Sequence, residues 1–120
     1  MALQISGTTV VDNSRNLANI ATFDSTVASI YDTVTTTAVS KTIVNREHVT
    51  VTANSQTITL PASPAAGWEI AISVGNFTGT IVGRNATNIM GLAEDMTIDT
   101  AYVTVHMIYS GDATQGWRVF

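Results

Sequence analysis

Across the last two thirds of the chain, apolar residues alternate with hydroxyl-bearing residues at the two-residue period of a β-strand. Residues 68–74 are the clearest case, because their large apolar side chains all fall on one face. Residues 102–109 form the longest and most apolar run, which predicts a central strand. Shorter runs bounded by glycine, asparagine, aspartate or proline predict further strands at 49–52, 57–60, 80–82, 96–98 and 117–120.

These short strands with frequent turn signals predict an all-β fold over residues 41–120, an antiparallel sandwich or barrel. Of the two we expect the antiparallel β-sandwich, of jelly-roll-like form. The chain does not alternate strands with helices, which argues against a dinucleotide-binding or flavodoxin-like enzyme. It also lacks a clean internal repeat, and on this ground we exclude a solenoid. Residues 1–40 are predicted as a separate N-terminal arm and connector.

The N-terminal arm carries apolar residues in short bursts that are separated by turn-forming residues. This spacing predicts strands of only a few residues, which cannot bury both faces alone. The arm therefore needs either the rest of the chain or another subunit. Its apolar residues are Leu3, Ile5, Val10, Leu17 and Ile20.

Two interpretations of residues 25–39 remain open. Val27, Ile30 and Val34 recur at helical spacing, which is typical of one short helix. The threonines at 33 and 35–37 oppose it, because β-branched residues suit extended backbone better. An extended connector is the second interpretation.

Composition changes this picture mainly through the kind of surface it implies. The 120 residues suit one domain, with 45% hydrophobic but only 12% charged residues, and threonine supplies about one residue in six. A surface of hydroxyls and amides is unusual for an intracellular enzyme. It suits a protein that packs against copies of itself or against another shell, because burying a hydroxyl costs less than burying a charge.

Charge and residue counts exclude several functional classes. The net charge of −4 and the absence of a basic stripe argue against nucleic-acid binding. The chain has no cysteine, so disulfides and thiolate metal sites are excluded. No apolar run approaches the length that spans a membrane, and the N-terminus lacks the pattern of a secretory signal.

Two groups of residues invite a metal or catalytic interpretation. Glu94, Asp95 and Asp99 could form a carboxylate pair or a calcium site, but a strand-like segment separates them, so solvated turn acids are the preferred interpretation. His48 and His106 have no cysteine or acid at metal spacing, and we expect packed or interface-facing histidines. We therefore assign no metal, cofactor or catalytic residue.

No recognised catalytic motif is present, and no serine or threonine has an evident base beside it, so we expect that the protein is not an enzyme. The aromatic residues could form a stacking platform for sugars, but a place in the core or in a subunit contact is the preferred interpretation. Asn76 and Asn85 begin Asn-x-Thr triplets, which we interpret as turns. These aromatics are Trp68, Tyr102, Tyr109, Trp117 and Phe120.

Several segments, taken together, resemble virion proteins of bacteriophages, especially phages of cyanobacteria and other aquatic bacteria. Residues 5–20 are similar to a segment that recurs along phage tail-fibre chains. The rest resembles a small β-rich module found at the distal end of fibres and tailspikes and in short decoration proteins. Its signatures here are Leu-Pro at 60–61 with Gly67, Gly-Leu-Ala-Glu-Asp at 91–95 and Gly-Trp-Arg at 116–118. In the family the residue after Gly67 is often aspartate, whereas this chain has Trp68.

The resemblance implies a homotrimeric virion structural protein, made in the host cytoplasm and placed on the virion. In such a trimer we expect the five apolar arm residues (Leu3, Ile5, Val10, Leu17 and Ile20) to lie in subunit contacts.

Two functions are compatible with the resemblance. The first is a capsid decoration (cement) protein that clamps major capsid subunits on the outer surface of a phage head, because the chain has no room for a long shaft. The alternative is a short tail-fibre or tailspike-like protein that recognises host surface glycans. Its binding loops would be 61–67, 75–79 and 110–116, with Trp68, Asn76 and Trp117 as candidate ligand contacts.

Overall fold

The computed structural model describes residues 3–5, 8–11 and 31–120, and within them the chain is all-β. The alternating sequence pattern therefore identified the secondary structure class correctly. The strands are β1 (Leu3–Ile5), β2 (Thr8–Val11), β3 (Thr33–Thr37), β4 (Lys41–Thr42), β5 (Glu47–Val51), β6 (Thr57–Thr59), β7 (Glu69–Val74), β8 (Thr80–Gly83), β9 (Met96–Ile98), β10 (Thr104–Tyr109) and β11 (Trp117–Val119).

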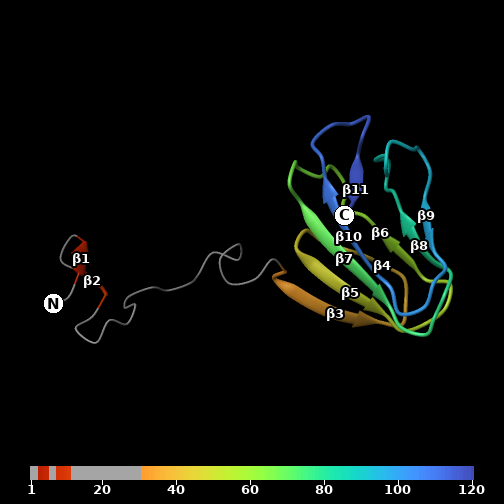
Figure 1. The fold of residues 1–120 in the computed structure, drawn as a ribbon, viewed down its shortest axis with the longest axis horizontal. Coiled ribbons are helices and arrows are strands. Elements are labelled where there is room, and N and C mark those ends of the chain that lie inside the picture. Colours follow the sequence, from red (N-terminus) through yellow and green to blue (C-terminus); the bar gives the residue numbers. More distant parts are fainter. Residues whose placement is uncertain (1–2, 6–7, 12–30) are drawn as a thin grey trace.

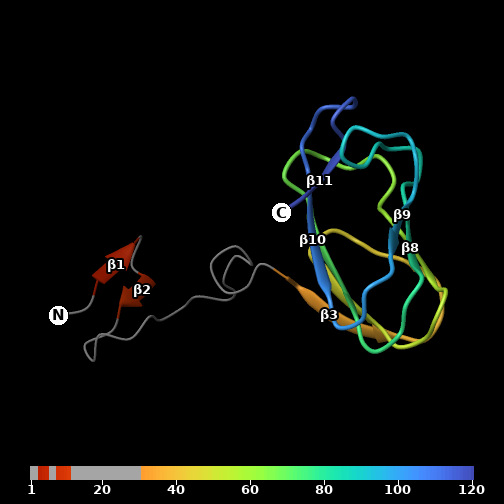
Figure 2. The ribbon, with the colours of Figure 1, turned by 45° about the vertical axis from the view of Figure 1, so that its right-hand side comes forward.

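The strands from β3 onward form two sheets that face each other (Figure 1). One sheet has five strands in the order β11-β10-β7-β5-β3, and the other has four in the order β4-β6-β8-β9. Figure 2 shows the sheets as two layers, with β3 and β10 in one and β8 and β9 in the other. The arrangement is sandwich-like, as predicted, but the sheets are mixed and not antiparallel throughout.

The mixed pairing arises because the chain crosses from one sheet to the other after every strand from β3 to β7. Strands β3, β5 and β7 are consequently parallel neighbours in one sheet, and β4, β6 and β8 are parallel neighbours in the other. Three turns of a solenoid-like winding thus lie inside the sandwich, so the exclusion of a solenoid was wrong for this part. Thr33 pairs with Glu47 whereas His48 pairs with Ala71, so the turns differ in length and leave no sequence repeat.

Antiparallel strands close the winding at its C-terminal end. Strand β9 pairs with β8, and β10 pairs with both β7 and β11. At the other end, β3 and β4 are the edge strands of their sheets. At one side of the sandwich the edge strands are β9 and β11, which pair antiparallel with their neighbours. At the other side the edge strands are β3 and β4, the first turn of the winding.

The core lies between the two sheets and consists of the residues that alternate inward along each strand. On β5 and β7 the period of two buries Val49, Val51, Ile70 and Ile72 completely. Trp117 on β11 is also completely buried, and its ring meets the edge of Tyr109 at a centroid distance of 5.5 Å. The other buried members are Ile43, Ile58, Leu60, Val74, Val82, Ile89, Ile98 and Met107.

A buried ion pair ties the first turn of the winding to the second. Glu47 is only 2% exposed, and its carboxylate accepts hydrogen bonds from Lys41 Nζ and from the backbone N–H of Val44. Burial alone would raise the pKa of Glu47, but hydrogen bonds from Lys41, Thr35 and Val44 and the charge of Lys41 together hold that pKa below its usual value.

For the described part of residues 25–39, strand β3 supports the extended connector and not the helix. Residues 33–37 are extended and belong to the five-stranded sheet, so that sheet begins before residue 41. Of the arm residues predicted in subunit contacts, Leu3 and Ile5 lie in β1 and Val10 lies in β2. Leu17 and Ile20 lie outside the described residues.

Candidate functional site

The outward-pointing face of the five-stranded sheet, here called the outer face, gathers the polar and aromatic side chains of distant segments. Its centre is one rung of the sheet, in which Ala71 on β7 is the Cα partner of both His48 on β5 and His106 on β10. Their sequence neighbours Val49, Ile70 and Met107 point into the core, so this rung points outward.

Tyr31 lies across this rung and joins the two histidines. Its hydroxyl is 2.8 Å from His106 Nδ1, and its ring centroid is 5.6 Å from that of His48 and 6.3 Å from that of His106. Ala71 between the histidines is completely buried although it points outward, which the overlying ring of Tyr31 explains. Phe120 extends the cluster, with its ring centroid 5.9 Å from that of His106.

A row of hydroxyls follows the histidine rung along the strands. Ser73 Oγ lies 2.6 Å from His48 Nε2 and 2.7 Å from Thr104 Oγ1. The sequence analysis missed this serine–histidine pair, because 25 residues separate the two positions. An activated serine also requires a group that orients the base and donors for the developing oxyanion, and among the described residues no acid is hydrogen-bonded to His48. The pair is therefore interpreted as part of the surface hydrogen-bond network.

Burial perturbs two of the titratable groups in the cluster. Desolvation raises the pKa of the Tyr31 hydroxyl, and the negative charge of Glu69 adds to this increase. Desolvation lowers the pKa of His48, and the proximity of His106 lowers it further. Both shifts favour the uncharged form of the side chain, so Tyr31 and His48 are neutral at pH 7.

Two rungs flank the histidine rung on this face. One holds the hydroxyls, and the other holds most of the charges. Arg46 Nε lies 3.5 Å from the carboxylate of Asp32. Glu69 pairs across the sheet with Ile108, which pairs in turn with Arg118. The outer face therefore runs from a charged rung through an imidazole and aromatic rung to a hydroxyl rung.

The two ends of the histidine rung expose apolar side chains. Val34 on β3, the partner of His48, is 75% exposed, and Phe120 after β11 is 66% exposed. Exposed apolar residues on a sheet face, between imidazole and phenol side chains that can form hydrogen bonds, are the composition expected for a protein contact.

The three candidate ligand contacts, Trp68, Asn76 and Trp117, do not form one site. Trp68 and Asn76 lie at opposite ends of β7, about 25 Å apart along an extended strand. Trp117 belongs to the core, so its ring is not on the surface. Trp68 is half-buried and packs against the core cluster, whereas Asn76 is exposed in the turn after β7.

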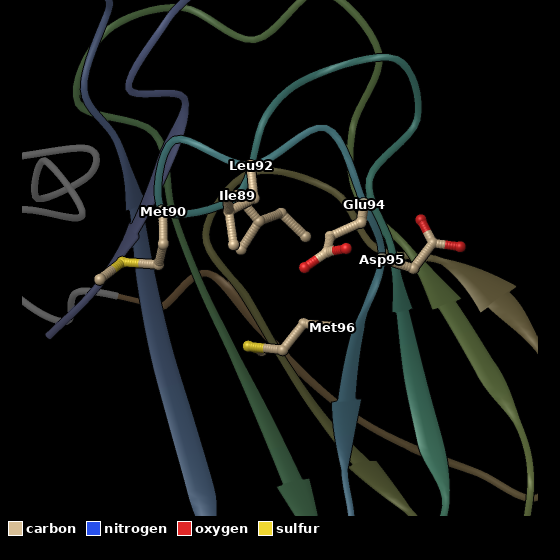
Figure 3. A pocket seen from close by; sticks show the side chains of 6 residues that line it. All are labelled: Ile89, Met90, Leu92, Glu94, Asp95 and Met96. Atoms are coloured by element: carbon tan, nitrogen blue, oxygen red, sulfur yellow. The ribbon is translucent and has the colours of Figure 1, made fainter.

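One pocket opens beside the turn that precedes β9 (Figure 3). Its volume of about 230 Å³ is below the range typical of small-molecule sites, roughly 300–1,000 Å³. Figure 3 shows that the carboxylate of Glu94 points into the pocket, whereas that of Asp95 points away. Asp95 instead accepts a hydrogen bond from the backbone N–H of Arg84. The pocket is lined by Ile89, Met90, Leu92, Glu94, Asp95 and Met96.

The acids that sequence analysis considered for calcium do not converge. Glu94, Asp95 and Asp99 are all exposed, and β9 separates the first two from the third. Among the described residues, no group of three or more acidic or histidine side chains could hold a metal ion. In the same part of the chain, no helix is long and apolar enough to cross a membrane.

Comparison with known proteins adds no assignment, because neither a protein-family model nor a curated protein matches the chain. The outer face is thus the best-defined candidate site, and its composition favours a protein partner.

Proposed function

We propose that this chain is a homotrimeric structural protein of a virus particle, a decoration protein that stabilises the outer surface of a phage head. The observation that carries the proposal is the outer face, where exposed Val34 and Phe120 flank a rung of histidines beside a row of hydroxyls. Such a face contacts another subunit with little desolvation of charge.

The proposed mechanism is mechanical and involves no chemical step. Each trimer contacts the major capsid protein through three equivalent surfaces at once. Contacts that are weak singly then bind strongly together, because the second and third form at high effective concentration. The hydroxyl-rich surface serves this role, since threonine and serine form hydrogen bonds across a contact at low desolvation cost.

The first test is the oligomeric state of the purified full chain, measured by native mass spectrometry or light scattering. We expect a homotrimer, and Phe120→Ser to weaken it because an exposed ring leaves the contact. Tyr102→Ser is the matched control, because Tyr102 is 79% exposed but lies in the turn before β10. A stable wild-type monomer contradicts the proposal.

The second test separates the decoration function from a fibre function. Labelled chain is located on virus particles by cryo-electron microscopy, together with its copy number. Density covering the capsid at regular positions supports the decoration protein. Density confined to the tail, with few copies, contradicts it and supports the alternative.

The alternative is a short tail-fibre or tailspike-like protein that binds host glycans, and one feature favours it. Loops 61–67 and 110–116 meet at one end of the sandwich, where the N–H of Gly67 donates to the carbonyl of Tyr109 over 2.9 Å. Half-buried Trp68 lies at the base of these loops, whereas loop 75–79 lies at the opposite end of β7. A glycan array with the wild-type chain and Trp68→Ala tests this function, which predicts binding that the substitution abolishes.

A further inference from the structure

Strand β3 is an edge strand with backbone groups available for pairing. It pairs with β5 on one side, and no described residue pairs with its other side. The N–H of Thr33 and the carbonyl of Thr37 bond toward β5. In a parallel ladder alternate residues bond to opposite sides, so the backbone groups of Val34 and Thr36 point away from the sheet.

This edge lacks the devices that normally prevent edge pairing. Native edge strands are protected by charged side chains, proline, bulges or very short length. Strand β3 is five uncharged residues, Thr-Val-Thr-Thr-Thr, without proline and in continuous register with β5. The opposite edge of the same sheet differs, because β11 has three residues including Arg118. Asp32 directly precedes β3, but its carboxylate lies 3.5 Å from Nε of Arg46, the residue before β5.

The same chain contains a strand pair that lacks a third strand. Within the part of the chain that the structure describes, strands β1 and β2 pair only with each other, with the register Gln4 to Thr9 and Ile5 to Thr8. An isolated two-stranded sheet is at best marginally stable in water, and a third strand adds both hydrogen bonds and apolar burial. Strand β2 has four residues, rich in threonine and valine, and matches β3 in length and composition.

We propose that strand β2 of one copy pairs with the free edge of β3 in a second copy, so that the β1–β2 pair extends the five-stranded sheet of its neighbour. The inference rests on the proposed homotrimer and names a strand contact that acts in it beside the outer face. Each copy both donates the β1–β2 pair and accepts one at β3. Such a head-to-tail contact closes into a ring when three copies meet.

The covalent geometry permits this exchange. Residues 12–32 join β2 to β3, and a chain of this length reaches at most about 70 Å. That reach covers the distance between neighbouring small domains. Among the described residues of one copy, β2 pairs with β1 and not with β3, which leaves the edge of β3 for the second copy.

Cross-linking tests the contact directly, because the chain contains no cysteine. Full-length Val10→Cys and Val34→Cys chains carry different affinity tags, are mixed under conditions that allow subunit exchange, and are treated with a short bifunctional maleimide. We expect a cross-linked species that contains both tags. The Tyr102→Cys chain mixed with Val10→Cys is the matched control and should give no such species. Tyr102 is exposed but lies in the turn before β10, which β7 and β5 separate from β3 in the strand order.

Edge charge provides an independent test. Thr36→Lys places a cation at the exposed edge, and we expect the concentration for half-assembly to rise about tenfold or more, as the loss of edge hydrogen bonds predicts. Thr97→Lys on edge strand β9 is the matched control and should assemble as wild type does.

The outcomes distinguish the two proposals. A trimer that forms without the mixed cross-link and tolerates Thr36→Lys overturns this contact but leaves the virion function standing. A further chain carries both Val10→Cys and Val34→Cys. If it forms only an intramolecular cross-link, β2 pairs with β3 of the same copy, and this also overturns the contact. A wild-type monomer at all concentrations contradicts both proposals.

Discussion

His48 and His106 lie in the same rung of the five-stranded sheet, and Ala71 is the paired residue of both. The sequence does not predict that positions 48 and 106 lie close together. Their proximity nevertheless affects the charge state of the outer face. Burial and then the neighbouring His106 lower the pKa of His48. The contact face is therefore sensitive to acid in a way that each histidine alone would not be.

The free energy of unfolding should fall as the pH drops from 7.5 toward 5.5. The pKa of His48 is lower in the folded than in the unfolded chain, so the unfolded chain takes up the proton first as the pH passes through about 6.5. This part of the stability is complete above that pH and is lost below it. Chemical denaturation across this range measures the slope, and His48→Gln should flatten it. An unchanged slope in His48→Gln contradicts the assignment.

The ion pair of Glu47 and Lys41 should act in a separate, more acidic range. The pKa of Glu47 is lowered in the fold, so its contribution is complete above the unfolded pKa near 4.5 and is lost as the pH falls further. Glu47→Gln should cost about 1–3 kcal/mol at pH 7, because the buried side chain loses its charged partner. Urea denaturation at pH 7 and pH 3 checks both effects. The difference between variant and wild type should shrink at pH 3, and an equal difference at both pH values would refute the assignment.

Gly116 should tolerate no side chain, whereas Gly67 should tolerate one at moderate cost. Both have positive φ, +68° and +88°. A Cβ at Gly116 would lie 2.0 Å from the carbonyl oxygen of Asn88, but at Gly67 it would meet nothing within 4 Å. We expect Gly116→Ala to cost about 4 kcal/mol or more and Gly67→Ala about 1–2 kcal/mol. Thermal unfolding of the two variants decides this, and equal costs would contradict it.

Residues 31–120 should fold without the N-terminal arm. This segment holds every strand of both sheets of the sandwich and all the buried core residues among those described. We expect cooperative thermal unfolding of the 31–120 fragment together with loss of the trimer. A fragment that begins at residue 38 is the control and should be clearly less stable, because it lacks β3 and the Thr35 hydrogen bond to Glu47. A non-cooperative 31–120 fragment would show that the arm belongs to the fold.

Local patterns determined the strands with good accuracy. The runs predicted at 57–60, 68–74 and 96–98 correspond to β6, β7 and β9 within one or two residues. This success has a physical basis, because alternation reports whether each side chain faces a core, and that property belongs to the strand itself. The arm, the trimer and the virion location are not tested by these contacts and stay predictions.

Pairing was decided only by the tertiary structure. Alternation in β5 and β7 identifies their inner faces, but the same faces result whether the strands are parallel or antiparallel. Only the tertiary structure shows that β5 and β7 are parallel neighbours, with buried Val49 and Ile72 as register partners in the same sheet. The contact between His48 and Ser73, the outer face and the free edge of β3 all follow from that long-range choice. The chain by itself thus determined which residues are buried along each strand, whereas the packing of strands distant in sequence decided which surface side chains came together.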